Sequence, residues 1–599
     1  MTNIKRWADL ILLVQAFVTI WSFECLGMLG ASNIIWFILL AAVILLYRFS
    51  SEYTAGLSTK TVPVTAIVFS GLYTFYNMSS ITKQYDNLLF KVIVLFVVFT
   101  GLFILFYHGL KIVYKWYLSL NALELFRTQC MNDANGIKSK VFLISFVICM
   151  IFWMPGYLYE FPGIVTPDSI NQIEQVLGLV PLSNHHPLMH TLLIGLCLRP
   201  IFAITGDLVI AIGFYTFVQM VLMALIVSYS INSLKLIGLK LRWVYLSLAF
   251  YVLIPFQWVY IVTVWKDVLF AGFIMLFVTT LIRVLVIGTE KIKITDLILH
   301  FIACVGTALF RSNGLYAFLL MIPLLCIWGF KAFRIRKRMI YTWGLSLAVI
   351  LIIRFPVMSA FGVIQPDIIE SLSIPIQLFC RVLVEDKDLG MEDTMMVNKV
   401  IDTTYIHELY APDFADNMKE LFRAGDIDYF EEHIFEYASL WIRTGLKYPS
   451  VYIDEYKNMT YGYWYPDNPA GEGTYTVADN DGVCNNGLGI ERRWLLGGIC
   501  ARLWQKIREI GTKLSTMLPL YGVLFCMGAA FFIECISIGV VLTQKQKGKI
   551  LPLLLPFFAV CTVLIATPVA ADFRYTYFLT MLLPIIVIYP AFTDYKLTE

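Results

Sequence analysis

The stretch from Trp153 to Arg199 decides how the rest of the sequence is interpreted. It reads WMPGYLYEFPGIVTPDSINQIEQVLGLVPLSNHHPLMHTLLIGLCLR. It begins as the end of an apolar helix that breaks at Pro162-Gly163, and it then presents Thr166-Pro167-Asp168-Ser169. Ionisable and turn residues therefore follow directly on an apolar run, as they do where a membrane helix emerges into water.

The second half of this stretch carries three histidines. A short polar helix leads to the turn Asn184-His185-His186-Pro187, and an amphipathic segment containing His190 follows. Much of the chain on either side is apolar enough to be membrane scaffold, so this loop is the first place to look for chemistry.

The composition excludes an ordinary soluble fold. The chain has 599 residues, of which 59% are hydrophobic and only 15% are charged, and its mean hydropathy is +0.75. Soluble domains have about 25% charged residues, and they cannot bury so large an apolar surface. We therefore expect an integral membrane protein. A net charge of +3 is too small to suggest nucleic acid as a partner.

Apolar runs long enough to cross a bilayer recur along the chain. A spanning helix needs about 20 apolar residues. The first run follows Lys5-Arg6 without a small-residue cleavage site, so we expect a retained anchor. About 14 spans are predicted, near 8–24, 31–48, 62–79, 88–107, 141–160, 207–230, 242–262, 267–287, 296–310, 315–330, 340–361, 516–541, 550–568 and 575–592.

The basic loops predict the orientation of these spans. They fall on one side of the membrane only if His186 to Arg199 does not cross it, and Arg199-Pro200 also interrupts that helix. We therefore expect this segment to lie on the outer surface, with both termini cytoplasmic in the cell membrane. The basic loops are Lys5-Arg6, the segment 108–140, Lys235 to Arg242, 290–293, Lys331 to Arg338 and Lys545 to Lys549.

The predicted fold is an all-α polytopic membrane protein with a mostly helical extracytoplasmic insertion. The insertion is acidic and long enough for a small domain. The expected parts are a four-helix membrane module with a cytoplasmic amphipathic segment (1–140), a catalytic membrane module (141–362) with its first outer loop at 161–206, the extracytoplasmic domain (363–515) and a three-helix C-terminal membrane segment (516–599).

Four polar motifs fall on the outer face in this topology. Charges within a span cost about 2.5–3.5 kcal/mol on insertion scales, whereas polar residues at helix ends are cheaper and are often interfacial anchors. Placement of all four on one face favours a shared function over anchoring. The motifs are the loop of Asp168, Trp265-Lys266-Asp267, Arg311-Ser312-Asn313-Gly314 and Ala571-Asp572-Phe573-Arg574-Tyr575.

The outer loop resembles that of the GT-C glycosyltransferases. The protein O-mannosyltransferases are the best comparison, because their loop has an acidic residue and a helix that opens His-Pro-Pro-Leu. The matching positions here are Asp168 and His186-Pro187-Leu188. This chain has one proline instead of two and no Asp-Glu pair, so the resemblance is at superfamily level and implies a GT-C-like membrane fold.

A longer pattern is similar to a family of uncharacterised bacterial multi-pass proteins. It covers most of the chain after about residue 140, so the first four spans would be an added module. The residues that carry it are Phe161-Pro162-Gly163, Pro167-Asp168-Ser169, His186-Pro187, Trp265-Lys266-Asp267, Arg311 to Gly314 and Ser373-Ile374-Pro375-Ile376-Gln377.

The GT-C resemblance implies transfer of a sugar from a polyprenyl-phosphate donor to an extracytoplasmic acceptor, either a cell-envelope glycan or a protein. The acceptor hydroxyl must lose a proton as it attacks, and a positioned carboxylate can accept that proton as general base. Asp168 is the candidate. The alternative is that Asp168 caps the helix that follows it.

The departing lipid phosphate needs cationic or hydrogen-bonding partners. For each cation, the alternative is a lipid headgroup contact or a local salt bridge such as Lys266–Asp267 or Asp572–Arg574. A divalent metal held by Asp168 with His185 or Asp267 is a further option. The candidates for binding donor phosphate or substrate are His185, His186, His190, Lys266, Asp267, Arg311, Asn313, Arg574 and Tyr575.

Two other classes of function remain open. A transporter or lipid flippase usually shows repeats, broken helices and ionisable residues at the membrane midplane, whereas polar residues here gather at one face. A non-catalytic cell-envelope assembly protein would use the 363–515 domain as a binding module.

Overall fold

The computed structural model describes residues 2–29, 33–119, 124–126, 139–288, 292–331, 333–466, 482–517, 523–544 and 547–592. Over these residues the chain is helical, and its β-structure is limited to isolated bridges. The all-α fold class is therefore confirmed. The amphipathic segment expected within 108–140 falls partly at 120–123 and 127–138, outside the described residues.

Eleven of the described helices are long and apolar enough to cross a membrane, and three shorter apolar helices accompany them. The protein is thus a polytopic helical membrane protein. The shorter three are α10 (Leu241–Leu253), α13 (Ile294–Leu309) and α26 (Met527–Thr543). The eleven are Arg6–Cys25, Ile34–Tyr53, Leu88–Tyr117, Lys140–Tyr159, Leu188–Thr205, Leu208–Leu236, Lys266–Ile287, Ser312–Phe330, Arg336–Ala360, Gly548–Ala566 and Phe573–Phe592.

Four of the fourteen expected spans are not among these eleven helices. Those expected at 296–310 and 516–541 correspond to the shorter helices α13 and α26. The run predicted at 242–262 breaks into α10 and α11 (Pro255–Ile261), because Pro255 forces Ile254 into an extended conformation (φ −80°, ψ 120°). The helix α3 (Thr61–Thr82) has the expected length. Asn77, Ser79 and Ser80 lower its hydropathy, and it is not among the eleven.

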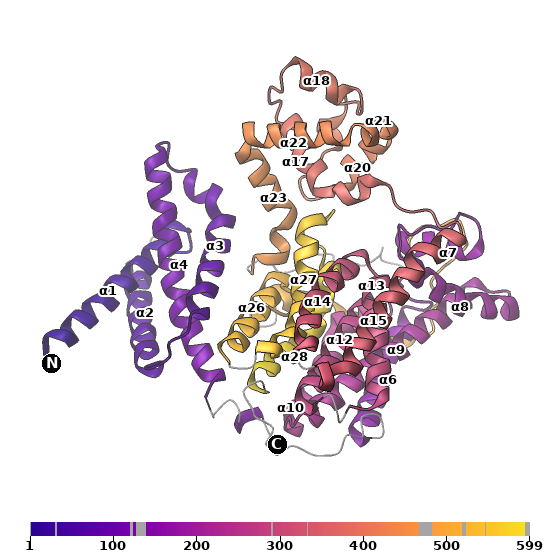
Figure 1. Cartoon of the computed structure of the whole chain (residues 1–599), viewed down its shortest axis with the longest axis horizontal. Coiled ribbons are helices and arrows are strands. Elements are labelled where there is room, and N and C mark those ends of the chain that lie inside the picture. Colours follow the sequence, from indigo (N-terminus) through magenta and orange to yellow (C-terminus); the bar gives the residue numbers. More distant parts are fainter. Residues whose placement is uncertain are drawn as a thin grey trace. The chain divides into compact units, whose positions relative to one another are not determined.

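The chain divides into two compact units. The first comprises Met1–Arg127, Phe532–Ile550 and Ile586–Glu599, so segments near the C-terminus complete the unit that the N-terminal helices begin. Its helices are α1 (Thr2–Cys25), α2 (Asn33–Tyr53), α3, α4 (Leu88–Tyr117) and α26 (Figure 1). Helices α1 and α4 approach closely at Gly101, where a Cβ atom would lie 2.5 Å from Ser22 Oγ.

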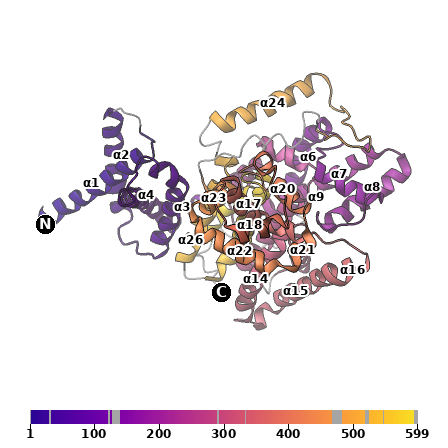
Figure 2. The same cartoon turned by 90° about the horizontal axis from the view of Figure 1, so that it is seen from above.

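The second unit, Thr128–Phe531 and Leu551–Ile585, contains every candidate site residue. Figure 2 shows α24 along one side of this unit and α15 along the opposite side. Its apolar helices are α6 (Lys140–Tyr159), α8 (Leu188–Thr205), α9 (Leu208–Leu236), α10, α11, α12 (Lys266–Ile287), α13, α14 (Ser312–Phe330), α15 (Phe333–Ile352), α27 (Leu551–Ala566) and α28 (Tyr577–Ile588), together with α24 (Gly498–Met517).

Helix α8 is the segment that was expected to lie flat on the outer surface. Its length and composition would also allow it to span a membrane. Figure 1 shows α8 running outward beside α7, across the general direction of α9 and α12. Its turn into α9 is tight because Gly206 takes a left-handed conformation (φ 65°) and Asp207 caps α9 through Val209 N and Ile210 N.

Residues 364–464 fold into a helical extramembrane domain. Its first core, around Ile376, Phe379 and Phe422, is entirely apolar, as expected for a domain that folds around its own interior. Its elements are the 3₁₀-helix η2 (Ile368–Leu372), α17 (Ser373–Val384), α18 (Met391–Asn398), α19 (Ile406–Leu409), α20 (Asp416–Arg423), α21 (Ile427–Glu432), α22 (Ile434–Lys447) and α23 (Pro449–Trp464).

Candidate functional site

Helix α7 (Pro167–Leu177) places Asp168 at the edge of the site. Thr166 is its N-cap, and the Ser169 hydroxyl accepts a hydrogen bond from Thr166 N at 3.2 Å. Ser169 in turn donates to Val264 O at 2.6 Å, and Trp265 Nε1 donates to Thr166 Oγ1 at 2.7 Å. The capping role considered for Asp168 thus belongs to Thr166 and Ser169, and the Asp168 carboxylate is directed elsewhere.

The backbone before α7 is held between two distant segments. Ile164 N donates to Val262 O at 3.0 Å, and Val264 N donates to Ile164 O at 2.9 Å. On the other side, Val165 N donates to Gly482 O and Cys484 N to Val165 O, each at 2.9 Å. The two bonds with Val262 and Val264 fix the start of α7 relative to the start of α12, which carries Lys266, and the other two join it to the segment that begins at Gly482.

A buried ion pair anchors the second of these segments. Arg492 binds Glu160 Oε2 at 3.1 Å, donates twice to Tyr159 O, and stacks on the rings of Tyr159 and Trp494. Both charged side chains are almost fully buried. Since breaking a buried pair is costly, the segment from Gly482 is firmly attached beside residues 159–165.

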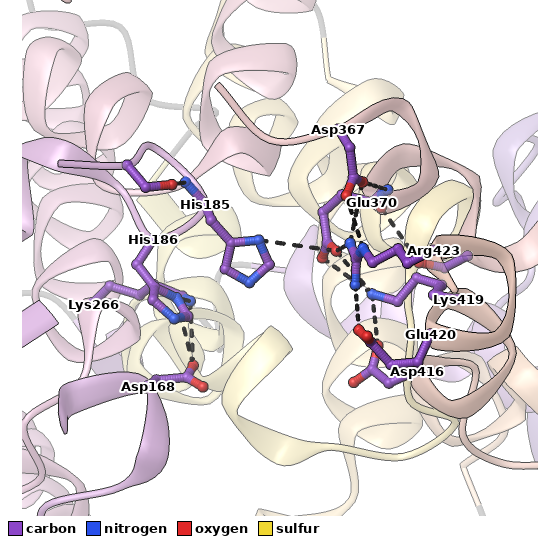
Figure 3. Close-up of polar contacts among 12 residues, drawn as sticks. Asp168, His185, His186, Lys266, Asp367, Glu370, Asp416, Lys419, Glu420 and Arg423 are labelled. Atoms are coloured by element: carbon purple, nitrogen blue, oxygen red, sulfur yellow. Dashed lines mark hydrogen bonds and ion pairs between the residues drawn. The ribbon is translucent and has the colours of Figure 1, made fainter. Parts of the chain in front are cut away.

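Asp168 is the centre of a three-residue contact with Lys266 and Arg574. Lys266 Nζ lies 3.3 Å from Asp168 Oδ2, and Arg574 Nη1 lies 3.4 Å from the same oxygen. Lys266 Nζ also lies 3.0 Å from His186 Nδ1 (Figure 3). The Asp168 side chain is 31% exposed, so the carboxylate remains accessible. Residues from three parts of the sequence thus meet at one carboxylate.

Burial and neighbouring charges shift the pKa values of Asp168 and His186 in this contact. Burial would raise the pKa of the Asp168 carboxyl, but the charge of Lys266, with that of Arg574, outweighs it and holds the pKa below its usual range. Burial, and then the adjacent Lys266 charge, lowers the pKa of His186 to about 2. At neutral pH the site therefore holds an ionised aspartate and a neutral histidine, whose Nδ1 accepts from Lys266.

Two further ion pairs, Asp267–Arg311 and Asp572–Arg574, adjoin the contact at Asp168. Asp267 forms a buried ion pair with Arg311, whose guanidinium stacks on the Tyr575 ring at 4.3 Å. Arg574 pairs with Asp572 Oδ2 at 2.6 Å and lies 5.1 Å from the ring centroids of Trp265 and Tyr575. The structure thus brings Asp168, His186, Lys266, Asp267, Arg311, Arg574 and Tyr575 into one cluster.

The remaining candidates lie outside this cluster. His190 is completely buried, with Nδ1 2.8 Å from Gln172 Oε1 and Nε2 2.7 Å from the Tyr215 hydroxyl, so its ring joins α7 to α9. His185 is exposed and lies 4.0 Å from Glu370 Oε2. Asn313 makes no hydrogen bond or ion pair with the residues of the cluster.

The structure shows where the three side chains considered as ligands for a divalent metal, Asp168, His185 and Asp267, are placed. Across the described ranges, no group of three or more His, Cys, Asp or Glu side chains could hold a metal ion. Asp168, His185 and Asp267 point to different partners, namely Lys266, Glu370 and Arg311. The arrangement around Asp168 is therefore suited to hold an anion with cations and to accept a proton.

A charged network on the extramembrane domain was not anticipated from the sequence. Lys419, which is buried, contacts both carboxylate oxygens of Glu370 at 3.1 Å, and Arg423 binds Asp367 and Glu370 (Figure 3). His185 Nδ1 lies 4.0 Å from Glu370 Oε2, so the loop between α7 and α8 approaches this domain (Figure 3). The spacing Lys419-Arg423 on one helix face was the only available signal.

The fold and site define a polytopic helical membrane protein with a carboxylate–cation cluster at the ends of its helices. Residues 178–596 match the model of a family described as Family of unknown function (DUF6020), and the chain belongs to that family. The matched range includes His186, Lys266, Arg311 and Arg574, and Asp168 lies just before it. No curated protein matches the chain, and no solved structure matches it.

Proposed function

We propose that this chain is a membrane glycosyltransferase that moves a sugar from a polyprenyl phosphate to an acceptor. The observation that carries the proposal is the contact of Asp168 with Lys266 and Arg574. Among the described residues, its ion-pair contacts all go to Oδ2, which leaves Oδ1 free to face an acceptor hydroxyl. An accessible, ionised carboxylate beside two cations suits a reaction that needs a base and releases a phosphate.

The proposed step is a single displacement at the anomeric carbon. The acceptor oxygen forms a bond to that carbon while Asp168 accepts the hydroxyl proton. The bond between the anomeric carbon and the phosphate oxygen breaks, and its electron pair leaves with the polyprenyl phosphate. Lys266 and Arg574 stabilise the charge that develops on the leaving oxygen, Lys266 as a point charge and Arg574 through two parallel hydrogen bonds.

Donor binding would also activate the base. In the free protein, Lys266 and Arg574 keep the Asp168 carboxylate strongly acidic and therefore a weak base. A donor phosphate that draws these cations away removes their effect, so the pKa of Asp168 rises toward its usual value. The carboxylate then becomes a better proton acceptor only once the donor is in place.

The other candidates receive supporting roles. His186 offers its Nε2 proton to a donor oxygen, and His185 lies on the open side toward the extramembrane domain. The pair Asp267–Arg311 and the Tyr575 ring hold Arg574 in position. To bind a divalent metal, Asp168, His185 or Asp267 would have to leave the side chains that they now contact, which are Lys266, Glu370 and Arg311 respectively.

The proposal includes an orientation. The cluster and the 363–515 domain face the outside of the cell membrane, both termini are cytoplasmic, and α8 lies flat on the outer surface. The acceptor is then an extracytoplasmic glycan or protein. The crosswise direction of α8 supports this topology, and so does the meeting of four outer-loop motifs in one cluster.

The direct test is turnover of donor lipid by the purified chain in lipid nanodiscs. A panel of polyprenyl-phosphate sugars would be supplied with water-soluble acceptor glycans, and released polyprenyl phosphate would be measured. We expect release with at least one donor by the wild type, and its loss in Lys266→Met. Turnover unaffected by Lys266→Met would contradict the proposed site.

A further inference from the structure

The extramembrane domain encloses an apolar cavity of about 200 Å³. The cavity lies between η2, α17, α18, α20, α21 and α22, within the first core of the domain. Protein interiors seldom contain voids larger than a water molecule. An engineered apolar cavity of about 150 Å³ in another protein binds benzene, so the space here is large enough for a ligand.

The lining offers nothing to a polar ligand. Of the described residues that line the cavity, only Tyr437 and Trp441 contribute polar side-chain atoms. The Tyr437 hydroxyl already donates to Met396 O at 2.8 Å, and Trp441 Nε1 donates to Pro375 O at 3.0 Å. A sugar, a phosphate or a metal ion would find no partner, and burying an unpaired polar group is costly.

The cavity opens onto an apolar surface. Ala438, which lines it, is exposed on α22, and Phe435 and Ile442 on the same helix face are 88% and 53% exposed. On neighbouring α18, Met391 and Met395 are 76% and 58% exposed. An ion pair from Arg443 to Asp393 at 2.7 Å holds the two helices together. Exposed apolar side chains therefore border the cavity where Ala438 reaches solvent.

We propose that this cavity holds one hydrocarbon chain of a membrane lipid. A peptide segment does not fit this lining, because its backbone N–H and C=O groups would be buried without partners. A hydrocarbon chain carries no such groups, and the bilayer in which this protein resides supplies such chains. The site is independent of the reaction proposed at Asp168.

This assignment gives a role to a motif that the cluster at Asp168 leaves unexplained. In Ser373-Ile374-Pro375-Ile376-Gln377, Pro375 and Ile376 line the cavity, and Pro375 O accepts the Trp441 hydrogen bond. Gln377 donates to Glu455 Oε1 at 2.9 Å and to Ala411 O at 2.6 Å, which fixes α17 against α23. The motif therefore builds one wall of the cavity and holds it in place.

Photolabelling of the full chain tests the proposal. The protein would be placed in phosphatidylcholine nanodiscs that contain a small fraction of either a diazirine fatty acid or a diazirine isoprenoid alcohol. After irradiation and digestion, mass spectrometry would locate the adducts. We expect adducts on peptides that cover 391–401 and 427–441, and the more efficient probe identifies the chain as acyl or isoprenoid.

Two variants fill the space and one serves as the matched control. Val397→Phe fills the cavity from within, and Ala438→Phe closes its mouth from an exposed position that folding tolerates. Each should lower labelling of these peptides about tenfold, because excluding even two methylene groups has that effect on affinity. Leu409→Phe adds the same ring at a partly exposed position of α19, outside the cavity lining, and should leave labelling unchanged. Adducts confined to the spanning helices, or labelling unaffected by Ala438→Phe, would overturn the proposal.

Discussion

Arg574 and Asp168 lie 406 positions apart in the chain, yet their side chains meet at 3.4 Å. Arg574 belongs to the 3₁₀-helix η6 (Phe573–Thr576), which leads into α28, and Asp168 opens α7. The start of α7 and the last apolar helix thus share one charged contact. Tests of this contact separate a functional role of each residue from a structural one.

The first prediction concerns the proposed base. Asp168→Asn should lower sugar transfer by about 10²–10⁴-fold, the usual loss when general-base assistance is removed. Folding should change little, because Asp168 is not the helix cap and partly exposed ion pairs contribute about 1 kcal/mol or less. Transfer and thermal unfolding would be measured on the same preparations. Glu174→Gln removes a negative charge from the same helix outside the cluster and should retain full activity; equal activity of both variants would exclude the base assignment.

A second prediction follows from the lowered pKa of Asp168. Above about pH 5 the carboxylate is ionised in both the folded and the unfolded chain, so its ion pairs stabilise the fold in full. Below about pH 4 the unfolded chain takes up the proton first, and that stabilisation is progressively lost. The difference in Tm between wild type and Asp168→Asn should therefore shrink between pH 5 and pH 3. A constant difference would mean that Asp168 has an ordinary pKa in the folded chain.

The third prediction assigns Arg311 a structural role. Asp267 is 1% exposed, so Arg311→Ala leaves a buried charge unpaired and should cost about 3–5 kcal/mol. The double variant Arg311→Met/Asp267→Leu should recover most of that stability, because apolar replacement of a buried pair is often neutral. Thermal unfolding of the three variants measures both effects. A stable Arg311→Ala protein that no longer binds donor would show instead that Arg311 serves the ligand.

Glu534 provides the fourth prediction. This residue of α26 is fully buried, and within the part of the chain that the structure describes neither of its carboxylate oxygens has a hydrogen-bond partner. Glu534→Leu should raise the free energy of unfolding by about 1–3 kcal/mol, the penalty of an unsatisfied buried polar group. Glu52→Leu, which changes an exposed carboxylate in the same unit, is the control and should give no such gain. A destabilised Glu534→Leu protein would indicate that the acid has a partner in the working state.

The fifth prediction tests the orientation. In intact cells, a cysteine replacing exposed Asn417 should react with a membrane-impermeant thiol reagent, whereas one replacing exposed Lys337 should not. The background would carry Cys500→Ser, because Cys500 is the exposed cysteine among those that the structure describes. The opposite labelling pattern would place the cluster at Asp168 on the cytoplasmic side.

Local patterns in the sequence were sufficient to locate most of the helices and several residues of the cluster. Runs of apolar residues predict helices because the pattern depends only on neighbours along the chain. Lys266, Arg311 and Arg574 were found because they are charged residues at the starts of apolar helices, where charge is uncommon. The expected span 242–262 is divided at Pro255, because proline disfavours a continuous helix. The sequence prediction missed this division because the residues on both sides of Pro255 are apolar.

The pairing of these residues could not be predicted. Lys266 reaches Asp168 over 98 positions, and only tertiary packing decides whether its partner is Asp168 or the adjacent Asp267. The same limitation applies to His190, which the spacing placed with the other histidines. The partners that engage it, Gln172 and Tyr215, are brought to it by the packing of α7 and α9.

Ile164 and Val165, just before α7, make main-chain hydrogen bonds to two distant segments: Ile164 to Val262 and Val264, and Val165 to Gly482 and Cys484. Main-chain hydrogen bonds do not depend on which side chain a residue carries, except that proline lacks the donor. Any residue with a backbone N–H can keep these hydrogen bonds, so the side chain is constrained only by packing, since Ile164 is 2% exposed and Val165 and Cys484 belong to a buried apolar core. In a saturation library, proline at these three positions should be depleted more than apolar residues of similar size, even though none of the three touches the charged cluster.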